Sequence, residues 1–157
     1  MIFYYWDASA WVKRYCREAG SSWVEDFFDH HPLAVCASLG YVEVMATLSR
    51  KKKAQEMASP AFAEKIQELE ADWERFFQVK MTDEIIALAA DVARDLALRG
   101  ADAIHLAAAL WFQRLLSAPE DRLVLVTADR ELKKGAQASK VEVVDPEEQE
   151  QDPQPEA

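Results

Sequence analysis

Short apolar runs alternate with longer stretches in which apolar residues recur at helical spacing. The runs are short, and those at 2–6 and 123–127 are rich in aromatic or β-branched residues, which is typical of buried strands, whereas 77–81 alternates between apolar and polar residues. Most of the longer stretches have apolar residues spaced three or four positions apart, which is typical of amphipathic helices, whereas 59–76 is largely polar and 102–117 is almost wholly apolar. The predicted strands are 2–6, 33–37, 77–81, 123–127 and 141–144, and the predicted helices are 8–17, 21–31, 38–53, 59–76, 82–99, 102–117 and 129–138.

The alternation of strands and helices predicts an α/β fold with a parallel sheet and helices on both of its faces. Right-handed crossovers then bring the carboxyl ends of the strands to one common edge. In such sheets, ligands bind beyond that edge. Functional side chains are therefore expected directly after the strands.

The end of the chain differs in composition from the rest. Residues 145–157 contain six acids and no Lys or Arg, so this tail carries more than half of the formal net charge of −10. A segment of this composition cannot bury enough apolar surface to fold. The sequence predicts one domain over residues 1–145 and a disordered acidic tail over 146–157.

Other features of the composition indicate a cytoplasmic protein. Cys16 and Cys36 lack the spacing of a zinc site or redox motif, and we expect them to be buried, reduced thiols. No signal peptide is visible after Met1, and no apolar run approaches the length of a membrane span.

Two acids follow predicted strands directly. Asp7 ends the run Phe3-Tyr4-Tyr5-Trp6, and Asp129 follows Leu125-Val126-Thr127-Ala128 in the same strand–acid–helix arrangement. Parallel strands would bring both carboxylates to one edge of the sheet. Each Asp could equally be the N-cap of the helix that follows.

Two further acids lie within apolar helical segments. Glu43 stands between Val42 and Val44, and Asp102 opens the almost wholly apolar stretch 102–117. Glu43 could point to solvent, and Asp102 could be another N-cap. If all four acids converge, their charges repel, and a hard cation such as Mg²⁺ or Mn²⁺ would neutralise them.

Basic residues lie close in sequence to each of these acids. A cleft with acids at its floor and cations at its rim suits a nucleic-acid backbone, although ordinary solvated helix faces would give the same pattern. The candidates for contact with RNA are Lys13, Arg14, Arg99 and Arg130.

The order of four motifs resembles the PIN domain, specifically the VapC-like toxins of prokaryotic toxin–antitoxin pairs. The motifs are YYWDASAWVKRY, SLGYVEVMATL, GADAIHLAAAL and LVTADREL, and the resemblance spans nearly all of residues 1–144. It implies an α/β/α sandwich and an endoribonuclease that depends on Mg²⁺ or Mn²⁺. It also implies a homodimer and a small cognate antitoxin that obstructs the active site.

The resemblance assigns the metal-binding and catalytic roles residue by residue. Asp7, Glu43, Asp102 and Asp129 match the acids of the motif, and Ser9 and Thr127 match the hydroxyls that support them. His105 matches a packing or hydrogen-bonding position, so we leave it out of the catalytic set.

Three alternatives to a toxin ribonuclease stay open at this point. The chain could be a PIN domain that acts in RNA processing, or it could cleave structured DNA. It could also be a protein-binding module without catalysis, with Trp6, Trp11 and Trp23 at its interface, although aromatic residues of this kind also suit a core.

Overall fold

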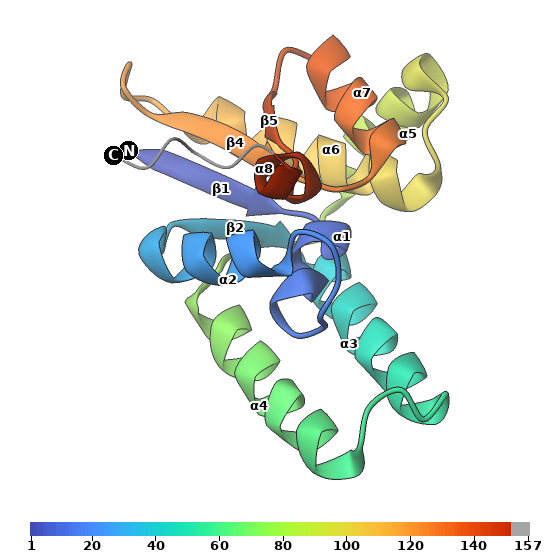
Figure 1. Ribbon diagram of the computed structural model, residues 1–157. Helices are drawn as coiled ribbons and strands as arrows, with labels where there is room; N and C mark the ends of the chain where they lie inside the picture. Colours follow the sequence, from blue (N-terminus) through green and yellow to red (C-terminus); the bar gives the residue numbers. More distant parts are fainter. Residues whose placement is uncertain (152–157) are drawn as a thin grey trace.

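A parallel five-stranded sheet lies at the centre of the computed structural model, which describes residues 1–151 (Figure 1). The strand order is β3-β2-β1-β4-β5, so β1 occupies the middle and has a parallel neighbour on each side. The strands are β1 (Ile2–Trp6), β2 (Ala34–Ala37), β3 (Phe77–Val79), β4 (Arg122–Val126) and β5 (Glu142–Val144). The predicted strands are confirmed, and β3 is shorter than expected.

The central strands have apolar residues on both faces because helices cover both faces. Tyr5 of β1 is paired in register with Val35 of β2 and Leu125 of β4, and all three are fully buried. A strand covered on both sides has no solvent face and therefore lacks polar alternation. This is the physical reason why these strands could be recognised as apolar runs in the sequence.

The helices form two layers, so the α/β/α sandwich is confirmed. One layer packs on the core that contains Phe3, Leu106 and Leu132, and the other packs on the core that contains Trp6, Trp11 and Leu48. No helix within residues 1–151 is long and apolar enough to cross a membrane. The first layer consists of α5 (Asp83–Leu96), α6 (Gly100–Leu115) and α7 (Arg130–Ala138), and the second of α1 (Ala8–Trp11), the 3₁₀ turn η1 (Val12–Arg14), α2 (Ser21–His30), α3 (Ser38–Lys53) and α4 (Ser59–Arg75).

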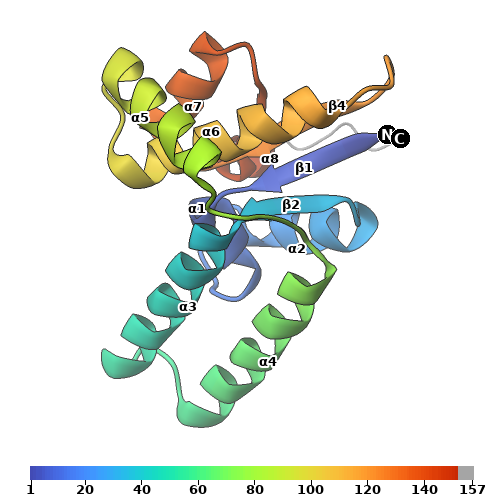
Figure 2. The same cartoon turned by 180° about the vertical axis from the view of Figure 1, so that it is seen from behind.

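The view from behind shows how α3 and α4 leave the sheet. Both helices extend away from the strands as a pair, and only their ends nearest the sheet lie beside the rest of the fold (Figure 2). The start of α3 follows directly after β2. Residues in the first turns of α3 therefore lie near the carboxyl edge of the sheet.

The first helix differs from the expected single helix over 8–17. It ends at Trp11 and tightens into η1 before Tyr15. Trp11, Val12, Tyr15 and Cys16 are all buried in one cluster, and the tighter turn directs these closely spaced side chains into the same core. Trp6 and Trp11 are fully buried, so they belong to the core and not to an exposed interface.

The expectation of a disordered tail is wrong for residues 146–151, which form α8 (Pro146–Gln151). The carboxylate of Glu150 accepts hydrogen bonds from the backbone N–H groups of Gly20, Ser22 and Trp23 at the start of α2. The N-terminus of a helix favours a negative charge, so Glu150 is bound by the fold and is not merely a solvated acid. The remainder of the predicted tail, 152–157, lies outside the described residues.

Candidate active site

A pocket of about 320 Å³ opens at the carboxyl edge of the sheet. It is lined by side chains from four separate parts of the chain. Asp7 follows β1, Asp129 follows β4, Glu43 comes from α3 and Asp102 from α6. The expectation that these four acids converge is therefore confirmed as a matter of geometry.

Asp7 is both a helix cap and a pocket residue. Its Oδ1 accepts a hydrogen bond of 3.0 Å from the backbone N–H of Ala10, which caps α1. The residue is only 3% exposed. Burial raises the pKa of the Asp7 carboxyl above its ordinary value, and the hydrogen bonds that it accepts from Ala10, Ser9 and Thr127 offset part of this effect. The two interpretations of Asp7 are thus compatible.

Two hydroxyls hold the Asp7 carboxylate in place. Ser9 Oγ lies 2.8 Å from both carboxylate oxygens, and Thr127 Oγ1 donates to Oδ2 at 2.8 Å. The same hydroxyls accept backbone hydrogen bonds, Ser9 from Ala128 and Thr127 from Asp129. This network ties the end of β1 to the segment after β4, so the expected supporting position of Ser9 and Thr127 next to the acid agrees with the geometry.

Glu43 projects into the pocket and does not simply point to solvent between its apolar neighbours. Its side chain is 32% exposed, and its Oε1 lies 2.5 Å from Nε2 of the buried His105. The other ring nitrogen of His105 lies 2.9 Å from the Tyr5 hydroxyl. One carboxylate oxygen of Glu43 is therefore fixed by the core, and the side chain borders the pocket.

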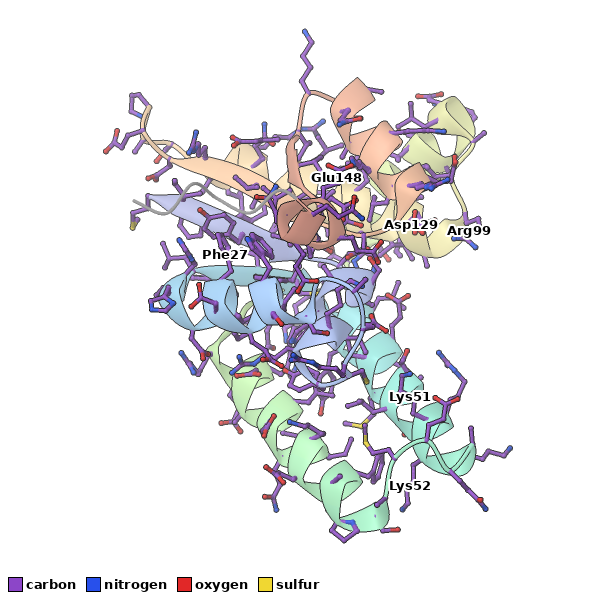
Figure 3. The ribbon with its side chains drawn as sticks, viewed as in Figure 1. Phe27, Lys51, Lys52, Arg99, Asp129 and Glu148 are labelled. Atoms are coloured by element: carbon purple, nitrogen blue, oxygen red, sulfur yellow. The ribbon has the colours of Figure 1, made fainter. Side chains whose placement is uncertain are left out.

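Arg99 connects Asp102 and Asp129 at the pocket. Asp102 is not an N-cap, because α6 begins at Gly100 and Arg99 takes the cap position. Arg99 lies 3.4 Å from a carboxylate oxygen of each Asp, and Figure 3 shows it beside Asp129. Asp129 also caps α7 by accepting the N–H of Leu132 at 2.8 Å.

The charge of Asp102 costs folding energy, which gives a testable prediction. Burial and the nearby Asp129 raise the pKa of the Asp102 carboxyl, and Arg99 opposes this rise. Folding therefore favours the protonated form, and stability is lost as pH rises from the ordinary Asp pKa through the raised one. In EDTA, Asp102→Asn is expected to unfold at a higher urea concentration than wild type at pH 7.

That advantage should shrink below about pH 4, where the carboxyl is protonated in both folded and unfolded chains. Urea midpoints measured between pH 4 and pH 8 check the effect. Asp91→Asn is the matched control, because Asp91 is exposed on α5. A variant of Asp102 that is less stable than wild type at pH 7 would contradict the expectation.

The donor set fits a hard divalent cation. The pocket gathers four carboxylates, two of them with pKa values raised by burial, and Arg99 is the one Arg or Lys among the described residues that line it. Within residues 1–151, no three His, Cys, Asp or Glu side chains form a group that could hold a metal ion as they stand. Mg²⁺ commonly uses one or two carboxylates and keeps several waters, so it does not require such a cage.

The proposed RNA contacts divide into two groups. Arg99 lines the pocket and its side chain is 77% exposed, and Arg130 is exposed at the start of α7 outside the pocket lining. Lys13 is buried and pairs with Glu18 and Glu147. Its expected role in RNA contact does not agree with this position, because its charge is already neutralised by the protein.

Arg14 is likewise committed to the fold. Its Nε donates to Asp72 at 2.7 Å, its Nη1 donates to Asp29 at 3.0 Å, and its guanidinium lies over the Phe28 ring. It does not line the pocket. Nearness to Asp7 in sequence was a poor guide here, because η1 turns the side chain toward α2 and α4.

Sequence reasoning left out one residue that the pocket contains. His105 lines it and contacts Glu43 directly, which agrees with the expected hydrogen-bonding role, but its position in the pocket was not expected. The signal available was its position three residues after Asp102 on the same side of one helix. Tyr5 contacts the other ring nitrogen of His105. Its sequence context gave no sign of this role, because it resembles any core residue of a strand.

Comparison with known protein families matches residues 4–138 to the PIN domain. Among curated proteins, Ribonuclease VapC45 and Ribonuclease VapC49 of Mycobacterium tuberculosis are similar to this chain. Each is 36% identical over 143 residues, which cover 88% of this chain and 92% of the relative.

Solved structures share the fold at lower sequence identity. PAE2754 from Pyrobaculum aerophilum aligns with a TM-score of 0.65 and 21% identity over 94% of both chains. A toxin–antitoxin complex from Klebsiella pneumoniae gives 0.63 and 17% over 90% of this chain and 96% of the other. FitAcB from Neisseria gonorrhoeae gives 0.66 and 15% over 93% of this chain and 98% of the other.

Proposed function

The chain belongs to the PIN domain family, and from that premise we propose that it is a metal-dependent endoribonuclease acting as the toxin of a toxin–antitoxin pair. The observation that carries the proposal is the convergence of four carboxylates from four elements on one pocket. The similarity to two proteins named as VapC ribonucleases supports RNA as the substrate. We also propose the cytoplasm as the place of action.

In this proposal Asp7, Glu43, Asp102 and Asp129 hold Mg²⁺ or Mn²⁺. When bound, the ion supplies positive charge that neutralises a phosphodiester and activates a water for attack. The residues themselves provide a rigid set of oxygens. Asp7 is the most firmly held, because Ser9 and Thr127 fix its carboxylate from two sides.

Arg99 is the residue of the pocket best suited to hold the RNA backbone. Its guanidinium can bind a phosphate through two parallel N–H groups. In the free protein it spans Asp102 and Asp129 through contacts of 3.4 Å, which are long for charged hydrogen bonds. Exchange of these carboxylates for a phosphate would therefore cost little. Arg130, exposed beside Asp129, is proposed as a second contact.

The proposed protein partner is a small cognate antitoxin. The fold neighbours include a toxin–antitoxin complex and a DNA-bound VapBC from Salmonella typhimurium. We also propose a homodimer. Co-purification with the product of a short neighbouring reading frame, and sedimentation of the purified chain, test these two partners separately.

The test of the activity compares RNA and DNA of the same sequence. We expect the purified chain to cut single-stranded RNA internally in the presence of Mn²⁺ or Mg²⁺, to leave the DNA intact, and to stop when EDTA is added. Labelled products resolved on a gel measure all three. Cleavage of the DNA alone, or of RNA at an equal rate in EDTA, would overturn the proposal.

A further inference from the structure

We propose that His105 and Tyr5 are positioning residues that hold Glu43 for metal binding through a fixed chain of hydrogen bonds. This inference rests on the proposed function, because it deepens the same site. It concerns two residues outside the proposed set of metal ligands. It assigns His105 a specific task where the sequence suggested a residue of packing or general hydrogen bonding.

The chain of hydrogen bonds runs from the backbone of the sheet to the pocket. The N–H of Ala37, at the end of β2, donates to the Tyr5 hydroxyl at 3.2 Å. The hydroxyl lies 2.9 Å from His105 Nδ1, and His105 Nε2 lies 2.5 Å from Glu43 Oε1. Tyr5 is fully buried and His105 is 2% exposed, so water does not compete for the contact between these two side chains.

The direction of each hydrogen bond follows from the donors available. An ionised Glu43 can only accept, so Nε2 of His105 must carry a proton. The Tyr5 hydroxyl already accepts from Ala37. If His105 also donated to it through Nδ1, the buried hydroxyl proton would be left without a partner, which is costly. The Tyr5 hydroxyl therefore donates to Nδ1 and selects the neutral tautomer that presents Nε2–H to Glu43.

Gly40 makes room for this arrangement. A Cβ at this position would lie 3.2 Å from His105 Cε1 and 2.3 Å from Cys36 Sγ, so no larger residue fits without displacing them. Gly40 and Glu43 lie on the same α3, one turn apart. The closeness of α3 to the His105 ring is thus built into the sequence of α3 itself.

The consequence is that the Glu43 carboxylate has a fixed orientation. One carboxylate oxygen is held by His105, and a glutamate has three side-chain torsions that would otherwise vary in a half-exposed position. Partners of this kind orient metal ligands, and their loss typically costs about 10–100-fold in metal affinity. The proposal predicts that loss of the Tyr5 hydroxyl is felt in metal binding, although Tyr5 does not line the pocket.

The test measures Mn²⁺ binding to the RNA-free protein by electron paramagnetic resonance of the unbound ion. We expect Tyr5→Phe and His105→Leu to weaken Mn²⁺ binding about tenfold or more. His105→Gln, whose amide can still donate to Glu43, should bind more tightly than His105→Leu. In cleavage assays, the half-saturating Mn²⁺ should rise in Tyr5→Phe, while the KM for RNA stays the same and kcat recovers at high Mn²⁺.

Tyr15→Phe is the matched control. Tyr15 is also a buried tyrosine whose hydroxyl is hydrogen-bonded on two sides, to Trp11 and Asp72, but it lies away from the pocket. It should lose stability without loss of Mn²⁺ affinity. Equal Mn²⁺ binding by wild type and Tyr5→Phe, or an equal weakening in Tyr15→Phe, would overturn the inference.

The outcomes also separate this inference from the proposed function. If the wild type binds Mn²⁺ but cleaves no RNA, the proposed function fails and the binding comparison still decides the role of Tyr5. If Tyr5→Phe does not fold by circular dichroism, the comparison of His105→Gln with His105→Leu decides it, and equal Mn²⁺ binding by those two overturns it. A wild type that binds no Mn²⁺ overturns both.

Discussion

Replacement of Asp7 by Asn is expected to lower kcat for RNA cleavage by about 10²–10³-fold, the size of effect seen when one preorganised stabilising group is removed from an active site. The physical reason is the loss of a negative ligand for the cation and of its fixed position between Ser9 and Thr127. Steady-state cleavage of a labelled RNA at saturating Mn²⁺ measures the change.

This substitution separates the two roles of Asp7. Asn is as good an N-cap as Asp, so the hydrogen bond to the Ala10 N–H and the start of α1 should survive. Burial raises the pKa of Asp7, so removal of its charge should not destabilise the fold at neutral pH. Asp7→Asn should therefore be inactive and fully folded.

Asp91→Asn provides the comparison, because it removes one charge from an exposed position of α5 and should retain full activity. If Asp7→Asn kept wild-type cleavage and was as stable as wild type, Asp7 would be a helix cap only. The proposed metal site would then have to be built without it.

The carboxylates after the strands could be predicted from sequence because their position depends on local signals. Asp7 and Asp129 each end an apolar run, and parallel pairing of β1 with β4 fixes their common edge. Thr127 is predictable for the same reason. These inferences need only the direction of the strands and not the details of packing.

The residues whose positions depend on helix packing were harder to predict from the sequence. The contact between Glu43 and His105 joins α3 and α6 across 62 positions of sequence, and it depends on the absence of a side chain at Gly40. Nothing local marks Tyr5 as their partner. The PIN resemblance supplied Glu43 as a site residue, but not the interaction that holds it.

Charge was the least reliable signal along this chain. Lys13 was expected at the rim of the cleft, yet it is buried against Glu147 of α8, a segment expected to be disordered. Composition counts charges but does not show which acid meets which base. A lysine and an acidic tail that look solvated separately can stabilise each other once the fold brings them together.

Replacement of Asp72 by Ala is expected to destabilise the protein by about 3–5 kcal/mol, the usual effect of removing one partner from a buried ion pair. Asp72 is 5% exposed, and one of its oxygens accepts both the Arg14 guanidinium at 2.7 Å and the Tyr15 hydroxyl at 2.5 Å. Alanine would leave a charged group and a hydroxyl without this partner among α2, η1 and α4. Urea unfolding at pH 7 measures the loss.

The same experiment decides between two roles for Arg14. If Arg14 holds the fold and does not contact RNA, Asp72→Ala should lose stability but keep its kcat/KM for RNA wherever it remains folded. Arg99→Ala is the matched opposite: its side chain is exposed at the pocket, so stability should stay near wild type while KM rises. A rise in KM for Asp72→Ala equal to that of Arg99→Ala, without a loss of stability, would indicate that Arg14 contacts RNA after all.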